Sequence, residues 1–233
     1  MLRSTRLPLA AESCPLIDPV SPVSALDHQP PWLTAVKGAA VAFSCVLIFR
    51  LAWRVGAVTV IDGWYWPVAV AIVLGYASAD FVSGSVHWFC DTFFSPQTPL
   101  VGPVIFRFRN LMMPPLAWLW WSDLPATGRP WALFGSSFLL ALSCGVGATN
   151  MLHKWAHDPA PPAAARWLQR RGLILSPERH WVHHQDHSRG FCVTSGWMNR
   201  LLDPIRFFPR LERCMRSMLP APMTGSDPGV DHR

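Results

Sequence analysis

Residues 131–152 read WALFGSSFLLALSCGVGATNML, an apolar run long enough to cross a bilayer as a helix. The run is rich in Gly, Ala and Ser, and such small residues favour close packing against another membrane helix. His153 and His157 follow directly, and their spacing of four residues places both imidazoles on one face of a helix. The segment therefore predicts a membrane helix whose end offers two nitrogen ligands to a metal ion.

Two further segments, at residues 33–53 and 64–88, have the length and apolar character of membrane helices. Residues 99–121 contain two arginines and a Pro114–Pro115 break, which favours a re-entrant or interfacial segment. Only 15% of the chain is charged, against about 25% in soluble domains, and Trp, common at membrane interfaces, outnumbers Tyr by 13 to 2. We predict an all-α fold, a multi-span transmembrane helical bundle with a histidine-rich cap at the membrane surface.

The chain is expected to form one membrane domain, at residues 32–214, between two disordered tails. Residues 1–31 are rich in Pro, Ser and Ala and have no helical period, and residues 215–233 are predicted to form the second tail. The net charge of +6, beside long apolar segments, favours anionic lipid headgroups as partners over nucleic acid. The six cysteines form no CxxC pair, which indicates buried thiols rather than a disulfide framework.

The densest polar motif is Glu178-Arg-His180-Trp-Val-His183-His184-Gln-Asp-His187, with four histidines in eight residues. His180 and His184 are four residues apart, as are His183 and His187, so a helix would pair the members of each couple. This spacing indicates a second source of metal ligands. A solvated basic patch is the alternative interpretation.

A third motif lies at the end of the second apolar segment, where Asp80, His87 and Asp91 are spaced i, i+7, i+11. On a helix these three side chains share one face. A carboxylate inside a membrane segment is costly and is a functional candidate. The three groups are expected to supply ligands or to hold ligands in place. Alternatively, they form a hydrogen-bonded polar cluster that only ties helices together.

The donor types restrict the metal. Imidazole and carboxylate without paired thiolates suit Fe, Zn or Cu and not an iron–sulfur cluster. A zinc site usually needs three or four ligands. Seven histidines in three motifs, with acidic neighbours, fit a dinuclear site better. A zinc membrane hydrolase is an alternative, although the chain has no HExxH motif.

Together these motifs resemble the Kua-type lipid desaturase family, whose members introduce double bonds into lipid chains, including the vinyl ether of plasmalogens. The matching stretches lie within residues 78–213, in the family's order: Asp80-Phe-x-Ser-Gly-x-x-His87-Trp-x-x-Asp91-Thr92, Asn150-x-x-His153-Lys-Trp-x-His157, His180-x-x-His183-His184 and Phe191-Cys-x-Thr-x-Gly-Trp197-x-Asn199. The resemblance implies a membrane enzyme with two non-haem iron ions, O₂ as co-substrate, a phospholipid or ether-lipid substrate and a cytochrome-type electron donor.

The resemblance also implies roles for individual residues. The expected iron ligands are the histidines of all three motifs: His87, His153, His157, His180, His183 and His184. His187 is expected to bind iron or to orient a ligand. Asp80 and Asp91 are expected to bridge the ions or to support their ligands, and Asn150 to donate a hydrogen bond near them. The expected membrane is the endoplasmic reticulum in a eukaryote, or a plastid, and the inner membrane in a bacterium.

One stretch departs from the family pattern. Relatives carry a second histidine box between the Asp80–Thr92 stretch and the Asn150–His157 stretch. This chain has Phe108-Arg-Asn-Leu-Met-Met-Pro-Pro115 there, and Ser122-Asp123 where a further histidine is expected. Leucine cannot bind iron and a methionine thioether suits it poorly, so one iron is expected to lack ligands. Asp91, Asp123, Glu178 and His187 are candidates to fill the gap. A non-catalytic membrane homologue with a partial metal site is therefore the alternative function.

The predicted spans also constrain the topology. His87 ends the second span and His153 ends the third, so the chain between them must cross the membrane an even number of times if both face one site. One crossing is clear, at residues 131–152. Residues 104–121 are therefore expected to enter the membrane as well.

Overall fold

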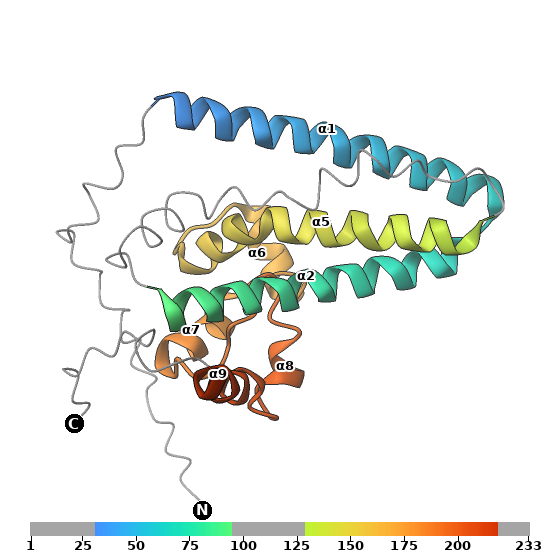
Figure 1. Cartoon of the computed structure of the whole chain (residues 1–233). Helices are drawn as coiled ribbons and strands as arrows, with labels where there is room; N and C mark the ends of the chain where they lie inside the picture. Colours follow the sequence, from blue (N-terminus) through green and yellow to red (C-terminus); the bar gives the residue numbers. More distant parts are fainter. Residues whose placement is uncertain (1–30, 95–128, 219–233) are drawn as a thin grey trace, which may run out of the picture.

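Three long helices dominate the computed structural model, which describes residues 31–94 and 129–218 (Figure 1). They are α1 (Pro31–Asp62), α2 (Tyr65–Phe93) and α5 (Pro130–His157), and each is long and apolar enough to cross a membrane. Within the described ranges the chain forms only helices and loops, without a strand. These findings confirm the predicted all-α, multi-span architecture.

The first helix is longer than predicted, since α1 covers Pro31–Asp62 rather than residues 33–53. It runs opposite to α2 and α5, which run in the same direction and end on the same side of the molecule (Figure 1). The ends that carry His87 and His153 therefore meet, as a shared site requires. The segment predicted to be re-entrant, at residues 99–121, lies outside the described residues. Of the tails predicted at 1–31 and 215–233, residues 1–30 and 219–233 also lie outside them, whereas Pro31 begins α1.

Close packing joins α2 to α5, the most extensive helix pair of the described structure. A Cβ atom added at Gly145 of α5 would lie only 2.5 Å from the Cβ of Ala79 in α2, so the helices approach at small residues. This contact agrees with the small-residue composition that predicted close packing. The resulting rigid pair holds the ends of both helices at a fixed separation.

Four shorter helices form the cap beside the C-terminal parts of α2 and α5 (Figure 1). They are α6 (Ala163–Arg170), α7 (Pro177–Gln185), α8 (Asn199–Leu202) and α9 (Phe207–Met218). α7 begins because the Ser176 side chain accepts a hydrogen bond from the backbone N–H of Arg179, with Pro177 in the first turn. α9 ends at Met218, so helix continues into the first four residues of the tail predicted at 215–233.

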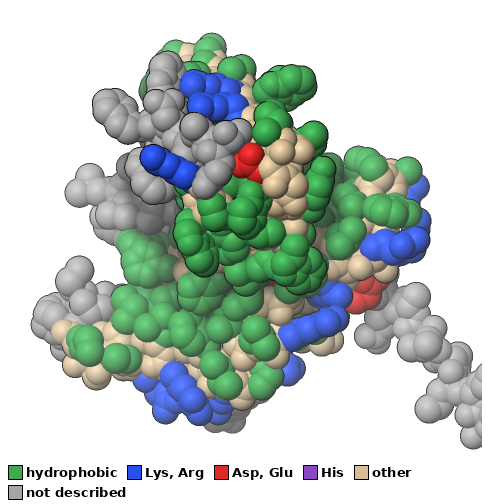
Figure 2. Space-filling model, turned by 90° about the vertical axis from the view of Figure 1, so that its right-hand side faces the viewer, with side chains coloured by type: hydrophobic (Ala, Val, Ile, Leu, Met, Phe, Trp, Pro, Cys, Tyr) green, Lys and Arg blue, Asp and Glu red, His purple; other side chains and the backbone are tan. Residues whose placement is uncertain are grey.

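An aromatic cluster attaches α9 to α2. The ring centroid of buried Phe208 lies 5.7 Å from that of Trp88 and 5.0 Å from that of Phe191. Elsewhere the long helices expose large apolar side chains, such as Phe49 and Trp53 of α1. Figure 2 looks along the long helices from the end where α1 turns into α2, and apolar side chains cover much of that face as well.

Candidate metal centre

One face of α2 carries the contacts that position the cap. Five residues of this face each contact a different part of the cap, and each has another of the five three or four residues away: Asp80, Ser83, Gly84, His87 and Asp91. The partners of the first four lie between Phe191 and Met198, in a segment that runs along the helix in the opposite direction. The prediction that Asp80, His87 and Asp91 share a face agrees with these contacts.

Asp80 anchors this segment, hereafter the 190–199 loop, and it is fully buried. Its Oδ1 accepts the backbone N–H groups of Thr194, Ser195 and Gly196 at 3.0, 2.7 and 3.0 Å. Its Oδ2 accepts the N–H of Met198 at 2.9 Å. Four N–H groups satisfy the buried carboxylate, so it acts as a structural anchor of the loop rather than as a member of a metal-binding group.

The next two contacts bring the loop against the helix backbone. Ser83 Oγ accepts the N–H of Val193 at 3.2 Å. A Cβ added at Gly84 would lie 2.5 Å from the sulfur of Cys192, so only glycine allows this approach without a shift. Asn199 holds the loop from within, since its side chain bonds both the N–H and the C=O of Cys192. The carbonyl of Phe191 is thereby fixed beside His87.

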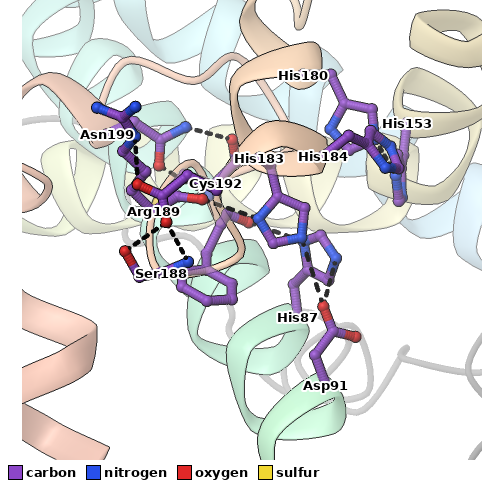
Figure 3. Close-up of polar contacts among 12 residues, drawn as sticks. His87, Asp91, His153, His180, His183, His184, Ser188, Arg189, Cys192 and Asn199 are labelled. Atoms are coloured by element: carbon purple, nitrogen blue, oxygen red, sulfur yellow. Dashed lines mark hydrogen bonds and ion pairs between the residues drawn. The ribbon is translucent and has the colours of Figure 1, made fainter. Parts of the chain in front are cut away.

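The first candidate metal group, hereafter the four-imidazole group, joins α5 to α7. Its members are His153, His157, His180 and His184 (Figure 3 labels three of them). The other three Nε2 atoms lie 2.8–3.0 Å from the Nε2 of buried His180. The Nε2 atoms of His153 and His157 are 3.2 Å apart.

This arrangement fits a metal ion better than a hydrogen-bond network. One imidazole nitrogen carries either a hydrogen or a lone pair, so His180 Nε2 can form only one N–H···N bond among three such contacts. Nitrogens bound about 2.0–2.1 Å from one metal ion lie roughly 3 Å apart, which is the spacing found here. His153, His157 and His180 therefore have the donors and the mutual spacing that suit one metal ion, with His184 beside His180.

The second candidate metal group, hereafter the Asp91 group, consists of His87, Asp91 and His183. Both imidazoles point their Nε2 atoms at Asp91 Oδ2, at 3.0 Å from His87 and 3.6 Å from His183 (Figure 3). Each ring also places Nδ1 beside a backbone carbonyl, that of Phe191 at 3.1 Å and that of Arg189 at 2.8 Å.

These carbonyls decide which nitrogen of each ring carries hydrogen. A carbonyl oxygen only accepts, so both Nδ1 atoms donate and the Nε2 atoms of the neutral rings carry lone pairs. Those lone pairs face a carboxylate, which is repulsive unless the rings take up protons or a cation lies between the three groups. Backbone carbonyls that orient histidine in this way are typical of metal sites.

The surroundings shift the pKa values of the α7 histidines in different directions. Burial, then the neighbouring imidazoles of His153 and His157, lowers the pKa of His180 to about 2, so its ring is neutral. Burial also lowers the pKa of His184. For His183, burial opposes the charged form, but the hydrogen bonds with Asp91 and the Arg189 carbonyl outweigh it and raise the pKa. The neutral rings of His180 and His184 are in the form that binds metal.

The two groups are neighbours. The ring centroid of His87 lies 4.7 Å from that of His183 and 5.4 Å from that of His153, which belongs to the other group. The centroids of His180 and His183 are 6.1 Å apart. The three motifs, widely separated in sequence, therefore meet at one end of the long helices.

Besides Asp80, three residues predicted for the site lie outside both groups. His187 follows the end of α7 at Gln185, so it does not continue the helical pairing, although its ring centroid is 5.4 Å from that of His183. Asn150 is exposed on α5. Glu178, a candidate replacement ligand, is exposed in the first turn of α7, whereas the histidines lie further along it. Asp123 lies outside the described residues.

Two parts of the site were missed at the sequence level. The carbonyls of Phe191 and Arg189 orient the histidines of the Asp91 group, and backbone groups carry no residue signature. The loop role of Asp80 was also missed. The Phe191–Asn199 motif could have indicated this role. It contains no His, Asp or Glu, so its residues are better explained by support of the site than by metal binding.

Fold and site together define a multi-span helical membrane protein with a histidine-rich candidate metal centre. Within that class the chain belongs to the lipid desaturase domain family, whose model matches residues 76–119 and 113–224. The resemblance to Kua-type lipid desaturases is thereby confirmed. No solved structure matches the chain.

Named relatives support the same family. A plasmanylethanolamine desaturase of Myxococcus xanthus is 39% identical over 171 residues, which cover 64% of this chain and 60% of that protein. Plasmanylethanolamine desaturase 1 of Mus musculus is 30% identical over 195 residues, covering 70% and 69%. The chloroplastic fatty acid desaturase 4 of Arabidopsis thaliana is 28% identical over 187 residues, covering 70% and 56%. The chain thus spans 60% of the length of its Myxococcus relative.

Proposed function

We propose that this protein is a membrane-bound lipid desaturase that holds two iron ions and uses O₂ to introduce a double bond into a lipid chain. The observation that carries the proposal is the meeting of seven donor side chains, six imidazoles and one carboxylate, in two adjacent groups at one end of the membrane helices. A centre there can act on a lipid held beside the same helices. The names of the two plasmanylethanolamine desaturases favour a phospholipid with an ether-linked chain as substrate.

The reaction removes two hydrogens from adjacent carbons of the lipid chain and reduces O₂ to two molecules of water. The balance requires two electrons and two protons from a donor, which we propose to be a cytochrome-type protein. Bound iron would supply the oxidising power needed to break an unactivated C–H bond. The four-imidazole group would hold one ion and the Asp91 group the other.

The protein's own contribution is to position these donors. The carbonyls of Phe191 and Arg189 hold the Nδ1 atoms of His87 and His183, so that both Nε2 atoms face Asp91. Asp80 fixes the 190–199 loop, which contains Phe191. α7 brings His180 and His184, one helical turn apart, to the histidines at the end of α5. The lipid chain would lie along the apolar surfaces of the long helices, away from water.

The changed second histidine box favours one other function. Residues 110–115 offer no imidazole or carboxylate where relatives have both, as a non-catalytic homologue with a partial metal site would. Such a protein would keep the fold and some metal but would turn over no lipid. Membrane lipid composition separates the two functions.

The test is to express the full chain in a bacterial host that makes ether lipids, with a matching electron donor, and to analyse lipids by mass spectrometry. We expect an O₂-dependent product two hydrogens lighter than its precursor. His180→Ala should abolish the product, and Gln185→Ala, an exposed change on the same helix, should not. An iron-loaded protein that yields no such product with ether-linked or diacyl phospholipids would identify the non-catalytic homologue.

A further inference from the structure

Exposed aromatic side chains mark one boundary of the membrane. Trp66 at the start of α2 and Trp131 at the start of α5 are 78% and 84% exposed. The two helices run in the same direction, so both starts lie at the end away from His87 and His153 (Figure 1). Trp is enriched where a membrane meets water. One membrane boundary therefore lies near the first residues of α2 and α5.

Helix geometry places the second boundary beside the metal groups. A hydrocarbon core about 30 Å thick is crossed by about 20 helical residues, at about 1.5 Å each. Counted from Tyr65 and Trp131, about 20 residues end roughly at position 85 of α2 and position 151 of α5. His87 and His153 follow closely, so the metal groups lie at the level of the lipid headgroups.

Two short helices of the cap pack against the long helices at this second boundary. α6 packs on α5, since its buried Ala165 belongs to one apolar cluster with Leu152. α9 packs on α2, where the ring centroid of Phe208 lies 5.7 Å from that of Trp88. Figure 1 shows α9 nearly end-on, so this helix crosses the direction of the long helices, as a helix at a membrane surface does.

The outward faces of α6 and α9 are strongly basic. Residues 163–173 include three arginines and no acidic residue, and residues 206–218 include four arginines and one acidic residue, Glu212. Glu212 is already paired with Arg216, at 2.8 Å. The six other arginines are all exposed and are called the basic rim: Arg166, Arg170, Arg171, Arg206, Arg210 and Arg213.

Exposed apolar side chains accompany the basic rim. Trp167 of α6 is 46% exposed, and Leu173 shortly after this helix is 40% exposed. Leu201 and Ile205, which precede α9, are 64% and 50% exposed. Basic and apolar side chains that occur together on short helices are typical of segments lying in the interface of a membrane.

We propose that the basic rim binds the headgroups of anionic phospholipids on the side of the membrane where the metal groups lie. A guanidinium group forms paired hydrogen bonds with phosphate, and the neighbouring apolar side chains enter the adjoining lipid layer. A soluble acidic protein would satisfy the arginines but would leave these apolar side chains exposed. The inference goes beyond the proposed function and does not depend on iron, because it concerns how the cap lies on the membrane.

The test compares two lipids with different headgroup charge. The unfolding midpoint of the purified full chain in detergent is measured with dioleoylphosphatidylglycerol or with dioleoylphosphatidylcholine, at equal concentrations. We expect the anionic lipid to raise the midpoint more, because a ligand that binds only the folded chain stabilises it, and high salt to reduce the difference.

A matched pair of variants assigns this difference to the basic rim. A variant that combines Arg170→Gln, Arg171→Gln, Arg210→Gln and Arg213→Gln should lose most of it. A second variant with lysine at the same four positions should keep most of it, because lysine retains the positive charge. If the four-glutamine variant does not fold, the two α9 substitutions alone replace it.

Two outcomes would overturn the inference. A wild-type chain that responds equally to both lipids would do so, and would favour a soluble acidic protein as the partner of the basic rim. A folded glutamine variant that keeps the full difference would also do so, since the anionic lipid would then bind elsewhere on the protein. Neither outcome affects the proposed function, which is measured by lipid product and bound iron.

Discussion

Asp80 Oδ1 accepts the backbone N–H of Ser195 at 2.7 Å, joining α2 to a loop that lies 115 residues later in the chain. Ser195 is fully buried, as is Asp80, so water cannot replace this bond. The contact explains why a carboxylate occurs in an apolar helix: it compensates backbone N–H groups that would otherwise be buried without acceptors. The contact also fixes the position of the 190–199 loop along α2. The loop in turn orients His87 through the carbonyl of Phe191.

Asp80→Ala should therefore destabilise the protein strongly. The substitution leaves four buried N–H groups without an acceptor, which we expect to cost about 3 kcal/mol or more. Thermal unfolding in detergent would show a lower midpoint, and iron bound at the Asp91 group would fall because Phe191 no longer holds His87. Glu212→Gln is the control, since its carboxylate is on the surface. Wild-type stability in Asp80→Ala would show that the loop does not depend on this anchor.

Gly84→Ala tests the close approach of the loop to α2. The added methyl group would meet the sulfur of Cys192, so the loop must move, at an expected cost of about 1–3 kcal/mol. Gly147→Ala is the matched control, because a Cβ at this α5 glycine has no neighbour within 4 Å. Replacing glycine by alanine in a helix should stabilise the control slightly. Equal effects of the two substitutions on the unfolding midpoint would contradict the described packing.

His180→Ala and His187→Ala should differ in bound metal. His180 lies at the centre of the four-imidazole group, so its loss should remove one of two iron ions per chain. His187 is exposed beyond the end of α7, so its loss should leave both ions. Elemental analysis of purified variants measures the difference. If His187→Ala lost iron and His180→Ala did not, the assignment of ligands would be wrong.

Removal of the metal should lower stability. An ion that binds only the folded chain stabilises it by about 4 kcal/mol at a free concentration 1,000 times its Kd. A chelator should therefore lower the unfolding midpoint of the wild type. It should have a smaller effect on a variant that lacks both His180 and Asp91. An equal drop in the two proteins would mean that the chelator does not act through these groups.

Much of the fold and part of the site follow from local sequence patterns. The apolar runs predicted the long helices, and helical spacing predicted the pairing of His153 with His157 and of His180 with His184. These inferences succeed because apolar length and the helical period are local properties. The helical pairing expected between His183 and His187 does not form for a local reason too, since α7 ends at Gln185, and the predicted role of His187 stays a prediction.

The contacts that create the site are not local. The sequence around Asp80 does not indicate its hydrogen-bond partners, because these are backbone N–H groups, those of Thr194–Gly196 and Met198. The division of seven donors into two groups likewise depends on how α7 lies across the ends of α2 and α5. Neither relationship has a sequence period, so neither could be predicted from spacing.

The most direct measurement is the number of iron ions bound per chain by the purified, folded, iron-reconstituted protein. The convergence of His87 and Asp91 with the α5 and α7 histidines predicts two ions. A folded chain that binds one ion or none under the same conditions would contradict the two-site account.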